Sequence, residues 1–201
     1  MERLSFLQAY LRNWRTIGAV TPSSHYLARR MLDLIDPARA MLVVELGAGT
    51  GAITGPLLRH LSPQARVLAV EIYPPFAEHL RRRFPDDRLE VIEGSAEALP
   101  QYLAERGLPS AAYVVSSIPF STLPAGVGRA IVAAAYRILE PGGALVAYQY
   151  SPFHLEPLLR AQFAHVARHL VLRNLPPAFV YRAVRPPEEA ASTPGAQGGP
   201  R

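Results

Sequence analysis

Residues 43–54 read VVELGAGTGAIT, and this stretch decides the fold of the chain. An apolar run ends at Leu46, and glycines at positions 47, 49 and 51 follow before a helical pattern begins. Glycine lets a chain turn sharply, and it lets a ligand approach the backbone where a Cβ would collide. The stretch therefore predicts a strand, a ligand-binding loop and a helix in immediate succession.

The chain around this loop alternates short apolar runs with longer helical patterns. Strands are predicted at 41–46, 66–72, 89–92, 111–116 and 144–150, and helices at 52–61, 75–84 and 126–139. The strand runs are apolar on both faces, which suits strands covered by helices on both sides. We therefore predict a Rossmann-like, doubly wound α/β sheet that is mostly parallel. Two final apolar runs, at 169–175 and 178–185, lie too close together for a crossover helix and predict an antiparallel hairpin.

Composition and charge exclude some kinds of site and favour one class of partner. With 201 residues the chain can bury one sizeable core, and the absence of cysteine excludes disulfides, thiolate metal sites and a thiol nucleophile. All 21 basic residues are arginine, and the net charge of +5 favours an anionic partner, either nucleic acid or an anionic phospholipid surface. The apolar runs are shorter than the roughly 20 residues of a membrane span, and the N-terminus lacks a signal-peptide pattern. We expect a cytoplasmic protein that can lie on the inner face of the cell membrane without crossing it.

Two cofactors compete for the glycine-rich loop. The run from Gly47 to Ala52 also fits the dinucleotide pattern G-x-G-x-x-G/A, in which a pyrophosphate sits at the helix N-terminus. Glu45, two residues before the first glycine, would repel a pyrophosphate but can accept a hydrogen bond from the amino group of a methionine-like moiety. This acid favours S-adenosylmethionine, with S-adenosylhomocysteine as product.

Further residues fit the nucleoside of that cofactor. Glu71 ends the second predicted strand, where a carboxylate can bind ribose hydroxyls, and the Ser95 side chain and Ala96 backbone can face an adenine edge. The alternative for both Glu45 and Glu71 is an exposed carboxylate at a strand end that binds no ligand. The predicted cofactor contacts are Glu45, Gly47, Gly49, Gly51, Glu71, Ile72, Ser95, Ala96 and Ser116.

A family resemblance rests on several motifs in a fixed order. The segments ELGAGTG, EGSAE, SSIPF and LEPGGALVAYQY, together with Glu71, resemble those of the class I S-adenosylmethionine-dependent methyltransferases over about residues 41–185. The resemblance implies a seven-stranded sheet whose last strand is antiparallel. This agrees with the hairpin predicted from the residues alone.

Two subfamilies place a proline motif after the fourth strand, as VVSSIPFSTLP (114–124) does here. In adenine N6-methyltransferases, including those of ribosomal RNA, an Asn or Asp precedes this motif and the aromatic ring stacks on the flipped base. Ile118, Pro119 and Phe120 fit that pattern, but Ser117 replaces the amide or acid. Ribosomal RNA adenine dimethyltransferase activity is therefore the alternative function, and nucleic acid the less favoured partner.

The chain as a whole resembles the bacterial phospholipid N-methyltransferases, through IGAVTPSSHYLARRM (17–31), ELGAGTG, SSIPF and YQYSP. This resemblance implies stepwise methylation of the amine of phosphatidylethanolamine towards phosphatidylcholine. A serine-capped helix start at TPSS could bind a lipid phosphate, or it could cap the helix without touching a ligand. The predicted substrate contacts are Ser23, Ser24, Ser117, Pro119 and Phe120.

Methyl transfer mainly requires a neutral amine held in line with the methyl group. His25, Tyr26, Tyr148 and Tyr150 are the candidates to orient that amine or to carry its proton away. Tyr148 and Tyr150 are two residues apart on a predicted strand and so face the same side, where they could bind a methylated cation or simply pack against a helix. His154, His165 and His169 show no acidic or cysteine partner at ligand spacing, and no metal site is predicted.

The segment RLSFLQAYLRNWRTIG (3–18) predicts an amphipathic helix with an apolar arc of about 160°. It could dock on a membrane or close over the protein's own core as a lid. The predicted membrane contacts are Leu4, Leu7, Leu11, Trp14, Arg12 and Arg15. The predicted organisation is this helix at 1–18, a methyltransferase domain at 19–185 and a disordered tail at 186–201. Methylation of a soluble amine, and lipid binding without turnover, are further open alternatives.

Overall fold

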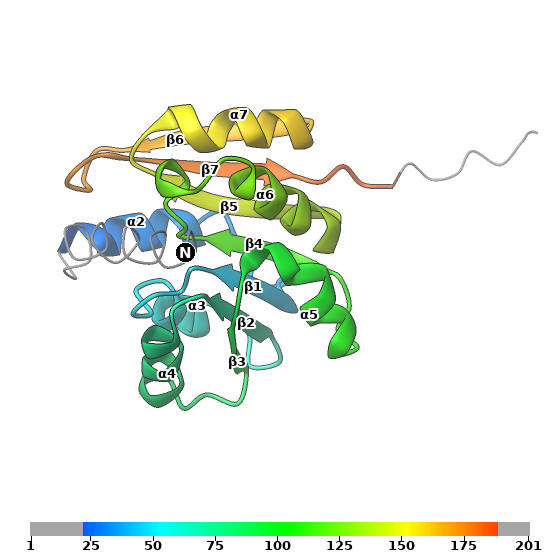
Figure 1. Cartoon of the computed structure of the whole chain (residues 1–201). Helices are drawn as coiled ribbons and strands as arrows, with labels where there is room; N and C mark the ends of the chain where they lie inside the picture. Colours follow the sequence, from blue (N-terminus) through cyan, green and yellow to red (C-terminus); the bar gives the residue numbers. More distant parts are fainter. Residues whose placement is uncertain (1–21, 189–201) are drawn as a thin grey trace, which may run out of the picture.

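The computed structural model describes residues 22–188, and over this range the chain forms one seven-stranded sheet with helices on both faces (Figure 1). The predicted helix at 1–18 and residues 189–201 of the predicted tail lie outside the described residues. The strands are β1 (Leu42–Leu46), β2 (Arg66–Glu71), β3 (Leu89–Glu93), β4 (Ala111–Ser116), β5 (Leu139–Gln149), β6 (His165–Val171) and β7 (Ala178–Val184). The helices are α2 (Pro22–Leu32), α3 (Thr54–His60), α4 (Pro74–Arg83), α5 (Leu99–Glu105), α6 (Val127–Ile138) and α7 (Pro152–Gln162), with short 3₁₀ turns η1 (Ala96–Ala98) and η2 (Phe120–Thr122).

The sheet has the order β3-β2-β1-β4-β5-β7-β6. Strands β1 to β5 pair in parallel, and β7 pairs antiparallel with both β5 and β6. The predicted Rossmann-like fold, with its antiparallel last strand, is confirmed.

Two strand boundaries differ from the sequence-based prediction. The predicted strand at 169–175 is wrong in its position, because β6 spans His165–Val171 and the second half of the run forms the connection to β7. In that connection the Asn174 side-chain amide is buried and donates a hydrogen bond to the Pro176 carbonyl at 2.6 Å. Strand β5 begins at Leu139, directly after α6, and its pairing with β4 shifts register between Ala111 and Tyr113.

The helices cover the sheet in two layers. Helices α5, α6 and α7 pack on one face, where Leu99, Ile131 and Leu155 join Val44 and Val114 of the strands. Helices α2 and α3 pack on the other face, and α4 covers the same side near β2 and β3 (Figure 1). All residues of the central strands β1 and β4 are buried. Helices on both sides of the sheet therefore explain why the strand runs are apolar on both faces.

Parallel strands bring their carboxyl ends to one edge of the sheet, here called the carboxyl edge. Leu46 of β1 pairs in register with Val70 of β2 and Ser116 of β4, and Ser116 pairs with Ala147 of β5. Strand β7 starts at this edge because it runs antiparallel to β5, so the connection at 172–177 lies there too. Within residues 22–188, none of the helices is long and apolar enough to cross a bilayer.

Candidate active site

The loop after β1 turns through three glycines. Gly47, Gly49 and Gly51 have φ angles of 67°, 57° and 83°, in the left-handed region that glycine adopts without strain. A Cβ on Gly51 would collide with the ring of Phe84, and a Cβ on Gly47 would lie 2.9 Å from the Ile118 side chain. The predicted cradle is therefore a tight turn packed against its neighbours. Positions 47 and 51 therefore favour glycine for both conformation and space, and position 49 favours it for conformation.

Glu71, at the end of β2, holds this loop from the side. The side chain is buried, and its two carboxylate oxygens accept hydrogen bonds from the backbone N–H of Gly49 at 2.8 Å and of Tyr73 at 2.9 Å. The alternative of an exposed strand-end carboxylate is thus wrong for Glu71. In the described structure this residue fixes the shape of the loop, and its contact with ribose hydroxyls stays a prediction.

Glu45 has a different environment, although it is also fully buried. Within residues 22–188, neither of its carboxylate oxygens accepts a hydrogen bond, and the nearby Thr54 hydroxyl is also buried with no hydrogen-bond partner there. Burial raises the pKa of Glu45 to about 7; Thr54 opposes this rise and the charge of Glu71 adds to it. An unpartnered buried carboxyl group at the start of a glycine loop suits a ligand that brings a positive charge or an N–H donor. The amino group of S-adenosylmethionine fits this requirement.

The SSIPF loop (residues 116–120) follows β4 directly beside the glycine loop. The Ser117 N–H donates to the Leu46 carbonyl at 2.9 Å, and the Ser116 hydroxyl accepts from the Ile118 N–H at 3.3 Å. The Ser117 hydroxyl is buried and has no hydrogen-bond partner in the described structure. This loop therefore presents an unused polar atom next to the glycine turn.

Gln149 holds the SSIPF loop in place, and sequence reasoning did not identify it. Its side-chain amide donates to the Ile118 carbonyl at 2.7 Å and the Tyr148 carbonyl at 2.6 Å, and its oxygen accepts from the Phe120 N–H at 3.1 Å. The side chain is 5% exposed. A glutamine at the end of a buried strand, between two tyrosines, is the sequence signal that could have identified it.

The tyrosine pair, Tyr148 and Tyr150, lies at the end of β5. The two rings meet edge to face with centroids 5.8 Å apart, and both pack against the helix α2 side of the sheet. Their predicted placement on one side of the strand is confirmed. Burial, and after it the neighbouring Tyr150, raises the pKa of Tyr148 far above its usual value. Tyr148 thus stays protonated near neutrality and can orient an amine without acting as a phenolate base.

The adenine contacts predicted after β2 and β3 lie at the same edge. Ile72 is 40% exposed, and Ala96 is buried in the first turn of η1. The Ser95 hydroxyl caps that turn by accepting from the Glu97 N–H at 3.3 Å, and it donates to the Glu97 carboxylate at 3.2 Å. Ser95 thus has a local structural role, to which an adenine contact would be added.

The first turn of α2 also reaches the carboxyl edge, although it faces the β6–β7 hairpin. His25 and Tyr26 are exposed, and the Arg173 guanidinium lies 5.7 Å from the centroid of the Tyr26 ring. The side chains of Ser23 and Ser24 lie outside the described part. Tyr26 is therefore placed at the rim of the site, and its predicted catalytic role stays a prediction.

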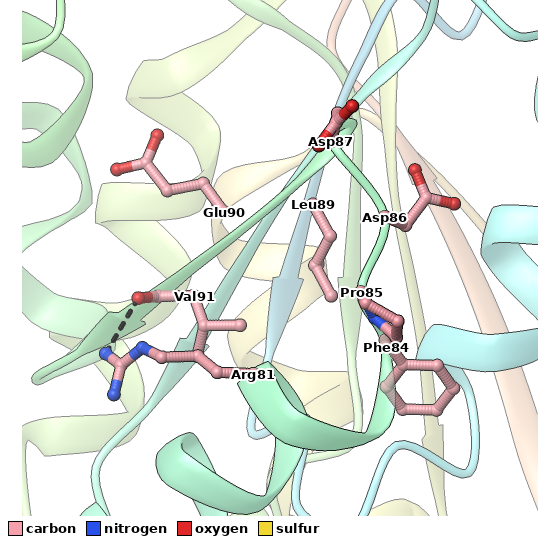
Figure 2. Close-up of a pocket in the computed structure, with 8 residues that line it drawn as sticks. All are labelled: Arg81, Phe84, Pro85, Asp86, Asp87, Leu89, Glu90 and Val91. Atoms are coloured by element: carbon pink, nitrogen blue, oxygen red, sulfur yellow. Dashed lines mark hydrogen bonds between the residues drawn. The ribbon is translucent and has the colours of Figure 1, made fainter.

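A hollow of about 540 Å³ lies away from these residues (Figure 2). It is formed around the connection from α4 to β3, at the opposite edge of the sheet, and Arg81 donates across it to the Val91 carbonyl at 3.0 Å. Asp86 on its rim binds Arg88, which also donates to the Leu58 carbonyl of α3. These contacts fix a loop, and we assign the hollow a structural role.

Comparisons with known proteins identify the family. Residues 43–143 match the family described as methyltransferase domain. An ornithine lipid N-methyltransferase of Singulisphaera acidiphila is 34% identical over 177 residues, which are 88% of this chain and 92% of that protein. A ribosomal RNA small subunit methyltransferase A of Bordetella pertussis is 40% identical over 87 residues, but these cover 43% of this chain and 30% of that protein.

A solved structure supports the fold. The N-methyltransferase NodS from Bradyrhizobium japonicum, in complex with S-adenosylhomocysteine, superposes with a TM-score of 0.69 at 14% identity, over 89% of this chain and 98% of that one. Together with the glycine loop and Glu45, these matches confirm the predicted cofactor and the enzyme class, an S-adenosylmethionine-dependent N-methyltransferase. The chain belongs to the class I S-adenosylmethionine-dependent methyltransferases.

Proposed function

We propose that this protein methylates the amine of phosphatidylethanolamine, and of its mono- and dimethyl forms, towards phosphatidylcholine at an anionic membrane surface. The observation that carries the proposal is the similarity to a lipid N-methyltransferase over nearly the whole length of both chains. The phosphatidylethanolamine headgroup itself is proposed from the resemblance of the TPSS, SSIPF and YQYSP motifs to the phospholipid enzymes.

The cofactor site is proposed to consist of Glu45 and the glycine loop, with Glu71, Ile72 and Ala96 around the nucleoside. S-adenosylmethionine supplies a methyl group that is already activated as a sulfonium. The protein then needs to position the acceptor amine and to exclude water. The tight glycine turn and the unpartnered Glu45 carboxyl support this assignment.

The acceptor amine is proposed to lie between the SSIPF loop and the tyrosine pair. The Ser117 hydroxyl is buried without a partner and can accept a hydrogen bond from the amine. The tyrosine rings can offer π faces to the growing methylammonium group, and each such contact is worth about 0.5–2 kcal/mol. Gln149 supports this arrangement because it fixes the backbone of the SSIPF loop.

Membrane docking by residues 1–18 and a location on the cytoplasmic face of the cell membrane belong to the same proposal. The amphipathic pattern of this segment and the net charge of +5 support it. Changing Leu7 and Leu11 to Asp is expected to abolish sedimentation with anionic vesicles while the sheet stays folded by circular dichroism. Unchanged sedimentation would reject docking through this segment.

Ribosomal RNA methylation is the second candidate, because a partial match to a ribosomal RNA enzyme and the Ile118-Pro119-Phe120 motif favour it. The deciding assay incubates the full chain and labelled S-adenosylmethionine with vesicles of phosphatidylethanolamine, vesicles of ornithine lipid, unmodified ribosomal RNA or a soluble amine. A Gly51→Ala variant, expected to lack the cofactor site, is the matched control.

Label is expected in phosphatidylethanolamine, with mono-, di- and trimethyl products separated by lipid mass spectrometry. Label in RNA alone would overturn the lipid proposal. Label in ornithine lipid alone would keep a lipid methyltransferase and reject the phosphatidylethanolamine headgroup, and label in the soluble amine without vesicles would reject both lipids. Binding of S-adenosylhomocysteine without transfer to any acceptor would favour a lipid-binding module.

A further inference from the structure

The connection between β6 and β7, residues 172–177 and here called the hairpin tip, exposes large apolar side chains. Leu172 is 71% and Leu175 is 83% exposed, and Leu170 at the end of β6 is 54% exposed. Such exposure of neighbouring leucines is unfavourable in water, and contiguous exposed apolar groups mark surfaces that meet another phase or partner. We therefore expect a membrane or another molecule to cover the leucines of the hairpin tip.

The hairpin tip lies at the same edge of the sheet as the candidate active site. Gln149, which holds the SSIPF loop, pairs in register with Phe179, one residue after the start of β7. Arg173 of the hairpin tip lies over the Tyr26 ring of α2. Phe153, in the first turn of α7 after β5, is 81% exposed and belongs to the same edge. The exposed apolar groups thus lie at the same edge of the sheet as the candidate active site.

The charge around the hairpin tip identifies the kind of occupant. Residues 165–184, which form β6, the hairpin tip and β7, contain the arginines Arg168, Arg173 and Arg182 and no acidic residue. Arg168 is paired with Glu156 at 2.8 Å, but Arg173 lies within the hairpin tip between the two exposed leucines. Among residues 22–188, Arg173 forms no ion pair with an acidic side chain. Leucines beside such an arginine are suited to the interface of an anionic bilayer, where apolar side chains enter the acyl boundary and guanidinium groups meet phosphates.

We propose that the hairpin tip inserts Leu172 and Leu175 into the interface of an anionic phospholipid bilayer, as a docking element separate from residues 1–18. Its orientation relative to the substrate rests on the proposed lipid methyltransferase function. Docking at this point turns the carboxyl edge towards the membrane, so that an acceptor amine can reach the SSIPF loop while the lipid stays in the bilayer.

A second copy of the chain is the competing occupant, because β6 is the edge strand of the sheet. Arg168 in the middle of β6 opposes the pairing of two such edges, because charged side chains on an edge strand disfavour edge-to-edge pairing. The test must therefore separate insertion into vesicles from self-association.

The chain contains no cysteine, so one introduced cysteine can carry a single environment-sensitive fluorophore. The label is placed in the full chain by Leu175→Cys, and in a matched control by Met41→Cys. Met41 is 55% exposed but lies just before β1, at the opposite edge of the sheet. Vesicles of phosphatidylglycerol and phosphatidylcholine are expected to shift the emission of the Leu175→Cys label to the blue and to leave the Met41→Cys label unchanged.

Binding measurements complete the test. Leu172→Ser and Leu175→Ser are each expected to weaken vesicle binding about tenfold, and Met41→Ser less than about twofold. Arg173→Gln is expected to weaken binding to the anionic vesicles about fivefold and to leave binding to phosphatidylcholine vesicles unchanged. Wild-type binding by the leucine variants, or an unshifted label at 175 on vesicles that bind the protein, would overturn the proposal.

A blue shift that appears without vesicles and grows with protein concentration would assign the hairpin tip to self-association instead. None of these readouts uses methyl transfer, so insertion can be established even where no lipid is methylated. Conversely, the protein could transfer methyl groups to phosphatidylethanolamine in detergent micelles while the label at residue 175 stays unshifted on vesicles that bind the protein. That result would keep the proposed function and reject this inference.

Discussion

Replacing Glu45 with Gln tests the site most directly, because the stability of the variant relative to wild type is expected to rise with pH while its cofactor affinity falls. The pKa of the buried Glu45 carboxyl is about 7, against its ordinary value of 4.5. Below pH 4.5 the group is protonated in both the folded and the unfolded chain. Between these two values the unfolded chain ionises first, so stability falls as the pH rises, and above pH 7 the loss is constant.

The size of the effect follows from the two pKa values. At about 1.4 kcal/mol per pH unit, ionising Glu45 destabilises the ligand-free fold by about 3 kcal/mol at pH 8 and by about 1 kcal/mol at pH 5. Gln cannot ionise, and its buried amide adds a constant cost at both pH values. In urea unfolding, the free energy of unfolding of Glu45→Gln minus that of wild type should therefore be about 2 kcal/mol larger at pH 8 than at pH 5.

Cofactor binding is expected to move in the opposite direction. An ionised Glu45 accepts a charge-assisted hydrogen bond from the ligand's amino group, so Glu45→Gln should bind S-adenosylhomocysteine at pH 8 about 10- to 100-fold more weakly by calorimetry. The affinity of the wild type should fall below about pH 7, and that of the variant should not. Equal stability differences at the two pH values, or unchanged affinity, would refute the assignment of Glu45.

Three other substitutions test separate parts of the site. Gly51→Ala puts a methyl group into the Phe84 ring and should lower S-adenosylhomocysteine affinity more than about tenfold in calorimetry, whereas Gly107→Ala, also left-handed but in open space, should not change it. Gln149→Leu leaves buried backbone groups unpaired and should lower the free energy of unfolding by about 2–4 kcal/mol. It should reduce the methyl-transfer rate more than the affinity for S-adenosylhomocysteine. Tyr148→Phe should lower the transfer rate without moving the pH–rate profile between about pH 6 and 9, because the phenol stays protonated; a displaced profile would assign the proton to it.

The residues that sequence could predict are those whose chemistry is local. Three glycines on alternate positions after an apolar run favour a tight turn, because glycine enters the left-handed region without strain, and Gly47, Gly49 and Gly51 adopt that region. The parallel sheet also follows from local patterns, because strands apolar on both faces need helices on both sides. The short spacing before β7 determined its antiparallel direction in the same way.

The residues that sequence could not predict act over long separations. Gln149 bonds to Ile118, 31 positions away, and Phe84 fills the space beside Gly51 from the far end of α4. Periodicity carries no information on such contacts, because it describes one element at a time. The predicted position of β6 was wrong for a related reason. The apolar pattern continues into the hairpin tip, where the leucines are exposed and not buried.

The two buried acids of the site differ because their partners differ. Glu71 receives two backbone N–H groups and so has its hydrogen-bonding needs met by the loop that it shapes. Glu45 receives none, and the ligand-free fold bears the cost of its burial. A chain selected for stability alone would carry an amide or an apolar side chain at position 45. Because relief of this cost requires a cationic donor, the site gains binding free energy from the positively charged end of the cofactor that it would not gain from a neutral ligand.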